Sequence, residues 1–181
     1  MNLLSMIRGH TTFAHGGVHP LEHKKETAGL PIRRLPFASK LVVPLSQHKG
    51  APAKPIVKVG EEVVRGEPIA EADGHVSVPM HAPATGRVVA IDLRPTAEGP
   101  KAPAIVIDVY DAASQQILYE EEVDILNLAP SEIVQFVKEA GLVGLGGAAF
   151  PSHVKMLPPA GKKIHTLIVN GCECEPYLTC D

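Results

Sequence analysis

Aromatic side chains, long apolar runs and excess charge are all scarce in this sequence of 181 residues. It contains no tryptophan and only 4% aromatic residues, so a folded core must be built from aliphatic and small side chains. No apolar run reaches the ~20 residues that a membrane-spanning helix needs, so we expect no direct membrane span. The formal net charge is −3, which gives no general attraction to nucleic acid, and we expect none to bind.

Secretion signals and disulfide patterns are also missing. The first residues, MNLLSMIRGHTTF, lack the charged start, apolar centre and cleavage site of a signal peptide. The three cysteines, Cys172, Cys174 and Cys180, are an odd number clustered at one end, unlike a disulfide framework. Their C-x-C-x5-C spacing is not that of an iron–sulfur site either. These features predict cytosolic chemistry and leave peripheral attachment to a membrane open.

Charge is unevenly distributed along the chain. Residues up to Gly50 are mostly basic where charged, and residues 105–140 are mostly acidic. A basic arm beside an acidic body is suited to a partner subunit or an anionic membrane face. The alternative is a pair of solvated faces without a binding role.

Residues 1–39 are expected to form an extended arm punctuated by proline. His15, His19 and His23 are spaced four apart and would share one face of a helix, as in a metal site. Glycines and a proline within that stretch disfavour a helix. We therefore predict loop histidines and no metal site.

Residues 40–112 carry short runs rich in valine and isoleucine, bounded by glycine, proline or aspartate. Such runs are typical of strands, and their regular spacing predicts a small barrel or sandwich. Asp73-Gly74 predicts a two-residue hairpin between two of them.

Residues 130–141, PSEIVQFVKEAG, predict a helix. Ser131 is the expected N-cap, and Gly141 suits the left-handed position that ends a helix.

The run Leu167-Ile168-Val169 predicts a strand buried on both faces. Polar residues beyond that strand would face a ligand, because ligands bind at the carboxyl ends of strands in open α/β sheets.

The glycine loop GLGGAA, residues 144–149, fits G-x-G-x-x-G/A. A dinucleotide fold requires the order strand, loop, helix, whereas here a helix precedes the loop and a strand follows it, which excludes that fold. Three interpretations stay open: a cradle for phosphate, a surface for a flat ring, or a plain structural turn.

Residues 57–91 resemble the biotinyl/lipoyl fold, a flattened barrel-sandwich. True carriers of that fold bear an acylated lysine at the hairpin tip. The corresponding tip here, residues 71–75, contains no lysine. Lys58 and Lys101 lie outside it, so we expect neither biotin nor lipoate.

GLGGAAFPSHVK followed by NGCECEPYLTCD resembles the flavin subunit of respiratory complex I. With GGVHP near the start and the barrel-sandwich ahead of the flavin motif, the chain is more similar to RnfC (RsxC). That family is the C component of the ion-translocating Rnf electron-transport complex. The resemblance covers essentially the whole chain.

The resemblance implies an FMN site. Its residues would be Gly144, Gly146 and Gly147 along the flavin, Lys155 at the phosphate or ring oxygens, and Asn170 at the flavin edge.

It also implies an NADH site. Phe150 would stack on a base of NADH, and Glu173 and Glu175 would face the nicotinamide; a core role and a solvated loop are the respective alternatives. Cys172 replaces an aspartate of the complex I pattern, which puts that polar contact in doubt. No residue is assigned a catalytic role.

The fold class we expect is mixed, α+β: an arm (1–39), a barrel-sandwich hybrid (40–112), an acidic connection (113–129) and the first part of an α/β flavin domain (130–181). One helix and one strand do not complete such a domain, so an N-terminal fragment is expected. The two [4Fe–4S] clusters expected in the family have no ligands in this chain.

The function that the resemblance implies is electron input from NADH through FMN to iron–sulfur centres. The protein would be peripheral, on the cytoplasmic face of the bacterial inner membrane and bound to the other Rnf subunits, and the fragment alone would be inactive. The alternative is a non-catalytic assembly module of the same kind of complex.

Overall fold

The structure is a computed structural model. It describes residues 20–97, 99–111, 114–117, 124–145, 147–158, 161–169 and 175–177. His15 and His19 lie outside these residues, as do the three cysteines.

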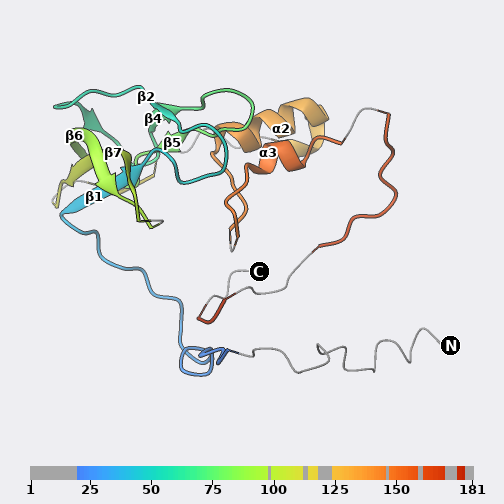
Figure 1. The fold of residues 1–181 in the computed structure, drawn as a ribbon, viewed down its shortest axis with the longest axis horizontal. Coiled ribbons are helices and arrows are strands. Elements are labelled where there is room, and N and C mark those ends of the chain that lie inside the picture. Colours follow the sequence, from blue (N-terminus) through green and yellow to red (C-terminus); the bar gives the residue numbers. More distant parts are fainter. Residues whose placement is uncertain are drawn as a thin grey trace.

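Two antiparallel sheets form the main body, which we call the barrel (Figure 1). The larger sheet has the order β1 (Lys40–Pro44), β7 (Lys101–Val109), β6 (Gly86–Pro95) and β3 (Glu62–Val63). The smaller has the order β2 (Lys54–Pro55), β4 (Pro68–Glu71) and β5 (Met80–His81). The short strands predicted within residues 40–112 are therefore present.

The core of the barrel is aliphatic, as the scarcity of aromatics requires. Strand β7 pairs with β1 on one side and β6 on the other, so its run Ala104–Ile107 is buried. Ile105 and Ile107 are fully buried, and Ile69 of the smaller sheet joins the same cluster. Val88 on β6 completes the contact between the sheets.

The predicted two-residue hairpin at Asp73-Gly74 is wrong. Strand β4 ends at Glu71 and β5 begins at Met80, so residues 72–79 form a longer connection. Gly74 does turn the chain with a φ of +88°. The longer path is held by Ser77, whose hydroxyl accepts from the Asp73 amide (3.0 Å) and donates to the Ala51 carbonyl (2.9 Å).

After the barrel come η1 (Ile125–Asn127), α2 (Pro130–Glu139) and α3 (Ser152–Lys155). The predicted helix is confirmed, but its N-cap is Ala129 rather than Ser131, because Pro130 takes the first helical position. The Glu132 carboxylate accepts a hydrogen bond from the Ala129 amide (2.6 Å) and so satisfies that end of the helix.

Gly141 ends α2 as predicted, with a φ of +69°. Its amide donates to the Lys138 carbonyl at 3.0 Å. The apolar residues of α2 are only partly covered. Ile133 and Val137 are half-buried and Phe136 is 37% exposed, so α2 has no fully buried residue.

The predicted buried strand at residues 167–169 is wrong in this structure. Residues 162–169 form no strand, and Leu167, Ile168 and Val169 are 86%, 83% and 84% exposed. A parallel strand needs neighbouring strands on both sides, and none of the described residues supplies them. The segment runs away from the barrel in an open path (Figure 1).

Candidate functional site

The glycine loop closes into a hairpin-like turn at the end of α2. Val143 and Pro151 form an isolated antiparallel bridge. The Gly144 amide donates to the Phe150 carbonyl (3.0 Å), and the Ser152 amide donates to the Leu142 carbonyl (3.0 Å). Residues 144–150 are therefore held at both ends by main-chain hydrogen bonds, and α3 follows directly.

Helix α3 returns Lys155 to the start of this loop. A Cβ placed on Gly144 would meet the Nζ atom of Lys155, so the ammonium group lies over the glycine backbone. Lys155 is exposed, and among the described residues no carboxylate pairs with it. The turn thus presents an accessible cation beside a glycine backbone.

Gly147 is exposed on the same turn. A Cβ at this position would have no atom of the described part of the chain within 4 Å. The protein itself therefore leaves room for a side chain here, and a glycine is not needed for packing. A turn with a cation over one glycine, Gly144, and an open surface at another, Gly147, has the features expected of a site for a flat ring that carries a phosphate.

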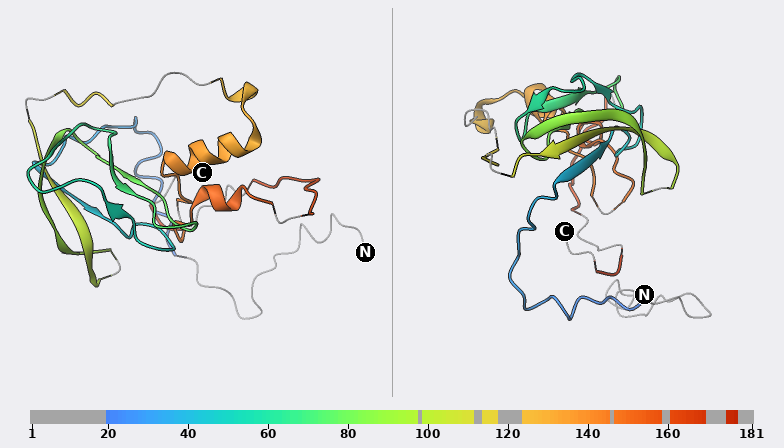
Figure 2. Two further views of the ribbon diagram at one scale, coloured as in Figure 1. Left: turned by 90° about the horizontal axis from the view of Figure 1, so that it is seen from above. Right: turned by 90° about the vertical axis from the view of Figure 1, so that its left-hand side faces the viewer.

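The glycine loop rests against the barrel through its main chain. The Lys49 amide donates to the Ala149 carbonyl at 3.1 Å. His153 of α3 is 2% exposed, and its Nε2 lies 2.8 Å from the His75 carbonyl, within the β4–β5 connection. Viewed from above, α2 and α3 lie side by side next to the sheets (Figure 2).

His153 was not predicted as a site residue. Its imidazole fixes the start of α3, and thereby the direction of Lys155 two residues later. The ring also meets His75 edge-on, with centroids 5.9 Å apart. A histidine preceded by proline and serine at a loop end carries no pattern that would single it out, because its partner is a main-chain carbonyl far away in the sequence.

Ala149 adopts a left-handed conformation with a φ of +49°. Such a φ is unfavourable for any residue with a Cβ, by about 1–2 kcal/mol. The hydrogen bond from Lys49 to its carbonyl holds this conformation. The loop therefore contains local strain next to its open glycine.

Beside this contact, a pocket of about 680 Å³ lies between the glycine loop and the barrel. Gly147, Ala148 and Ala149 line one side, and the barrel loop from Ser46 to Gly50 lines the other. His48 in that wall is buried, with its Nε2 3.1 Å from the Ala51 carbonyl and 3.2 Å from the Ser77 hydroxyl. Burial lowers the pKa of His48 below its ordinary value, while the hydrogen bond to Ala51 opposes that change.

His81 of β5 lies where the barrel contacts the end of α2. Burial lowers its pKa, opposed by a hydrogen bond with the Glu139 main chain at the end of α2. The backbone of Gly141 also approaches the His81 ring and the Pro79 carbonyl.

The structure brings together four of the predicted site residues: Gly144, Gly147 and Phe150 lie in the turn, and Lys155 reaches Gly144 from α3. Phe150 is half-buried. Its exposure is intermediate between that of a ring free to stack on NADH and that of a core residue, so it decides for neither.

Gly146, Asn170 and Glu173 lie outside the described residues. Glu175 is described and exposed, and no described hydrogen bond or ion pair joins it to the turn.

The segment that holds Glu175 contacts the N-terminal arm instead. The Tyr177 amide donates to the Glu22 carbonyl at 3.0 Å. The Tyr177 and His23 rings stack with centroids 4.8 Å apart. His23 is therefore the one member of the predicted histidine series that the structure places, and it packs against an aromatic ring.

Among the described residues, no helix is both long and apolar enough to cross a membrane. In the same part of the chain, no group of three or more histidine, cysteine, aspartate or glutamate side chains is arranged to hold a metal ion.

Two protein families match this chain. Residues 12–112 match the family described as RnfC barrel sandwich hybrid domain. Residues 137–181 match the family described as Nuo51 FMN-binding domain, and this match includes the whole glycine-loop turn. The mixed fold class predicted from the sequence is confirmed.

Curated relatives are similar over nearly the whole chain. The C component of the Na(+)-translocating ferredoxin:NAD(+) oxidoreductase complex of Acetobacterium woodii is 41% identical over 95% of this chain and 39% of its own length. The C component of the ion-translocating oxidoreductase complex of Pseudomonas aeruginosa is 44% identical over 92% of this chain and 22% of its own. The C component of the proton-translocating ferredoxin:NAD(+) oxidoreductase complex of Clostridium ljungdahlii is 43% identical over 92% of this chain and 36% of its own length.

The chain thus spans between about a fifth and two fifths of the length of these relatives. The matched barrel domain makes up more than half of the chain, and a match to an FMN-binding domain follows it in sequence. The chain belongs to the RnfC family of ion-translocating oxidoreductase subunits.

Proposed function

We propose that this chain provides the barrel and the first part of the flavin site of an electron-input subunit, in which NADH reduces bound FMN. The observation that carries the proposal is the closed turn of residues 144–150 with the Lys155 ammonium returned over Gly144. The match to an FMN-binding domain over residues 137–181 supports it.

The residues of the turn fit the chemistry of FMN. The exposed Lys155 ammonium complements a phosphate or the ring oxygens, because no described carboxylate neutralises it. Gly147 leaves open the space that a ring needs to approach the main chain. When bound, FMN would supply the redox chemistry, accepting a hydride and releasing electrons singly.

The protein residues would bind and orient. Lys155 would hold the cofactor at one end of the turn, and Asn170 would donate to or accept from the flavin edge. Phe150 would stack on a base of NADH. Glu173 and Glu175 would line the nicotinamide side and position the ring that gives up the hydride.

Electrons would pass to iron–sulfur clusters of the full-length subunit, for which this chain provides no ligands. The subunit would sit peripherally on the cytoplasmic face of a bacterial inner membrane, bound to the other subunits of an Rnf-type complex. The relatives named as ferredoxin:NAD(+) oxidoreductase subunits support the redox part of this proposal.

The test compares two glycine substitutions in the full-length subunit. Gly147→Val adds a side chain where the protein leaves space, so a loss of FMN binding comes from collision with the cofactor. Gly29→Val, on the arm, adds the same side chain where no atom lies within 4 Å and serves as the control. FMN fluorescence titration should show binding to the wild type and Gly29→Val, and weak or no binding to Gly147→Val.

Two outcomes contradict the flavin assignment. One is a Gly147→Val subunit that binds FMN as tightly as the wild type, which would make the loop a plain turn. The other is a wild-type subunit that binds no FMN at all, which would favour the alternative, an assembly module without a redox role.

A further inference from the structure

A second pocket, remote from the glycine loop in sequence and composition, lies where the N-terminal arm meets the barrel. It has a volume of about 920 Å³. Its lining comes from the arm (Arg34, Leu35, Pro36 and Phe37), from the β3–β4 turn (Arg65) and from the segment after β7 (Gln115, Gln116 and Ile117). No described residue of α2, α3 or the glycine loop lines it.

The barrel side of this pocket is built from tethered groups. The Arg65 Nη1 donates to the Gln115 carbonyl at 3.0 Å, and its guanidinium lies 5.1 Å from the centre of the Phe37 ring. The Gln115 side chain in turn accepts from the Thr85 amide (2.9 Å) and donates to the Thr85 carbonyl (3.3 Å). Arg65 is thus half-buried and held in one orientation before any ligand arrives.

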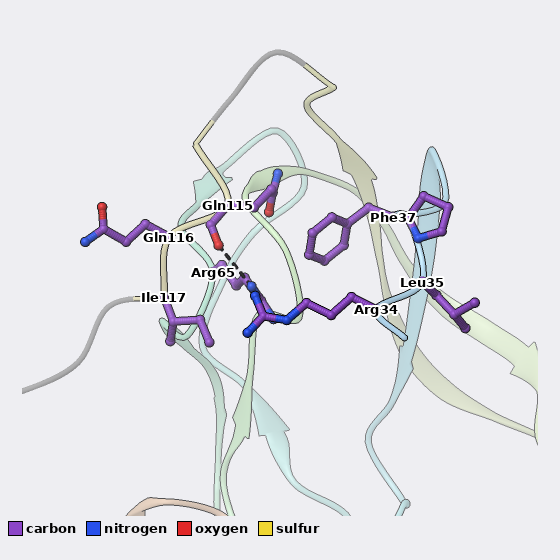
Figure 3. Close-up of a pocket in the computed structure, with 8 residues that line it drawn as sticks. Arg34, Leu35, Phe37, Arg65, Gln115, Gln116 and Ile117 are labelled. Carbon is purple, nitrogen blue, oxygen red and sulfur yellow. Dashed lines mark hydrogen bonds between the residues drawn. The ribbon is translucent and has the colours of Figure 1, made fainter. Parts of the chain in front are cut away.

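Among the described residues that line it, the pocket has two positive charges and no negative one. The Arg34 side chain extends toward Arg65 (Figure 3). Among the described residues no carboxylate forms an ion pair with either arginine. Two guanidinium groups directed at one space repel each other unless an anion lies between them.

The walls beside these charges are apolar. Leu35 is 88% exposed, Phe37 is 41% exposed, and Ile117 is half-buried. A free inorganic anion would use the arginines but would leave these side chains in water. A ligand that fills the pocket therefore combines a carboxylate with an adjacent apolar side chain.

We propose that this arginine pocket binds an acidic segment of a partner protein, with an aspartate or glutamate on Arg34 and Arg65 and a neighbouring apolar side chain against Leu35 and Phe37. Arginine suits this role because its planar fork binds a carboxylate with two parallel hydrogen bonds. The site shares no residue with the flavin turn. It would let the basic arm seat the subunit on another component of the complex.

A direct test uses a fluorescein-labelled peptide of alternating glutamate and leucine with the 181-residue chain. Fluorescence anisotropy should show saturable binding, which Arg34→Gln weakens by about tenfold, the loss expected for one charge-assisted contact. Arg33→Gln is the matched control, because it removes the same charge from the adjacent residue, which does not line the pocket. A second peptide, with glutamine in place of glutamate, should bind the wild type only weakly. Its affinity for the wild type should not exceed the affinity of the glutamate peptide for Arg34→Gln.

Three outcomes overturn the proposal. Equal weakening by Arg33→Gln and Arg34→Gln would show diffuse attraction only. Equal binding of the glutamine peptide would show that carboxylates are not recognised. Full competition by inorganic phosphate, with no loss in Leu35→Ala, would make this a phosphate site.

A second experiment uses the full-length subunit in its native membranes. Arg34→Gln should be released by salt more readily than Arg33→Gln, while its FMN content and NADH-dependent flavin reduction stay unchanged. Protein-free vesicles of phosphatidylglycerol and phosphatidylcholine should not bind the subunit. Binding to such vesicles that Arg34→Gln abolishes would assign the pocket to a lipid headgroup instead.

Discussion

The barrel and the glycine-loop region are stabilised in different ways. The barrel buries a cluster of aliphatic side chains between two sheets, with Ile69, Ile105 and Ile107 fully inaccessible. Helix α2 buries no residue completely, and residues 164–169 expose most of their apolar surface. The barrel can therefore fold on its own core, whereas the glycine-loop region depends on contacts with the barrel.

Those contacts are few and mostly involve the main chain. Among the described residues they include the Lys49–Ala149 hydrogen bond, the His153–His75 contact, the His81–Glu139 hydrogen bond and the close approach of Gly141 to Pro79. Contacts of this kind fix orientation more than they contribute buried area. The turn that we assign to FMN is thus positioned by the barrel before the rest of a flavin domain is considered.

The largest expected effect comes from exchanging isoleucine for alanine once in each of the two regions. Ile107→Ala creates a cavity in the barrel core and should lower the free energy of unfolding by about 2–5 kcal/mol. Ile168→Ala removes the same atoms from a side chain that is 83% exposed and should change it by less than about 0.5 kcal/mol. Urea unfolding of the 181-residue chain measures both. Similar losses in the two variants would contradict the division.

The next effect concerns the join between the regions. Gly141→Ala places a Cβ 2.8 Å from the Pro79 carbonyl at a φ of +69°, so α2 should detach partly from the barrel, at a cost of about 1–3 kcal/mol. Gly161→Ala has a similar φ of +73° but no neighbouring atom within 4 Å, and is the control. Hydrogen exchange should speed up in α2 only in Gly141→Ala. Equal exchange in both variants would show that the contact with Pro79 does not hold the helix.

We expect the stability of the barrel and of its contact with the glycine-loop region to depend on pH. Burial lowers the pKa of His48 and His81 below the ordinary value of 6.5, so the unfolded chain binds protons more readily than the folded chain. The contribution of the two neutral histidines to the free energy of unfolding should be fully present above pH 6.5. It should decline as the pH falls from 6.5 toward their folded-state pKa values. Thermal unfolding across this range checks it, and His48→Gln should flatten the decline. A melting temperature that rises on acidification would contradict the sign.

The smallest effect lies in the turn itself. Ala149→Gly relieves the left-handed strain at φ +49° and should stabilise the turn by up to about 1 kcal/mol, less the greater backbone entropy of glycine in the unfolded chain. Ala148→Gly, next to it and not at a positive φ, should be neutral or destabilising. Hydrogen exchange of the Gly144 and Ser152 amides measures the difference. A destabilised Ala149→Gly would show that the strain is absent in solution.

Much of the barrel could be predicted from the sequence, because the signal is local. A run such as Ala104–Ile107 between turn residues predicts a buried central strand, and β7 is one. The Asp73-Gly74 hairpin was wrong because distant groups decide it: Ser77 and Ala51 hold the connection in a longer path. Ser131 was wrong as the N-cap because the proline before it fits the first helical turn.

The candidate site could be predicted only in part. The turn that joins Gly144 to Lys155 follows from residues close in sequence, so a motif can indicate it. The supporting contact of His153 with His75 depends on the fold of the barrel and carries no local pattern. Leu167-Ile168-Val169 has the apolar, β-branched composition of a buried strand. Such a run forms a strand only where neighbouring strands pair with it, and its own composition does not show whether they are present.

The central claim, that the turn of residues 144–150 with Lys155 holds the flavin phosphate or ring oxygens, is tested most directly by the charge of Lys155. In the full-length subunit, Lys155→Met should raise the dissociation constant of FMN by about tenfold or more, as expected when a charge-assisted contact is lost. Lys101→Met, an exposed lysine at the start of β7, removes the same charge from the barrel and should leave FMN affinity unchanged. Equal FMN affinity in Lys155→Met and Lys101→Met would contradict the account.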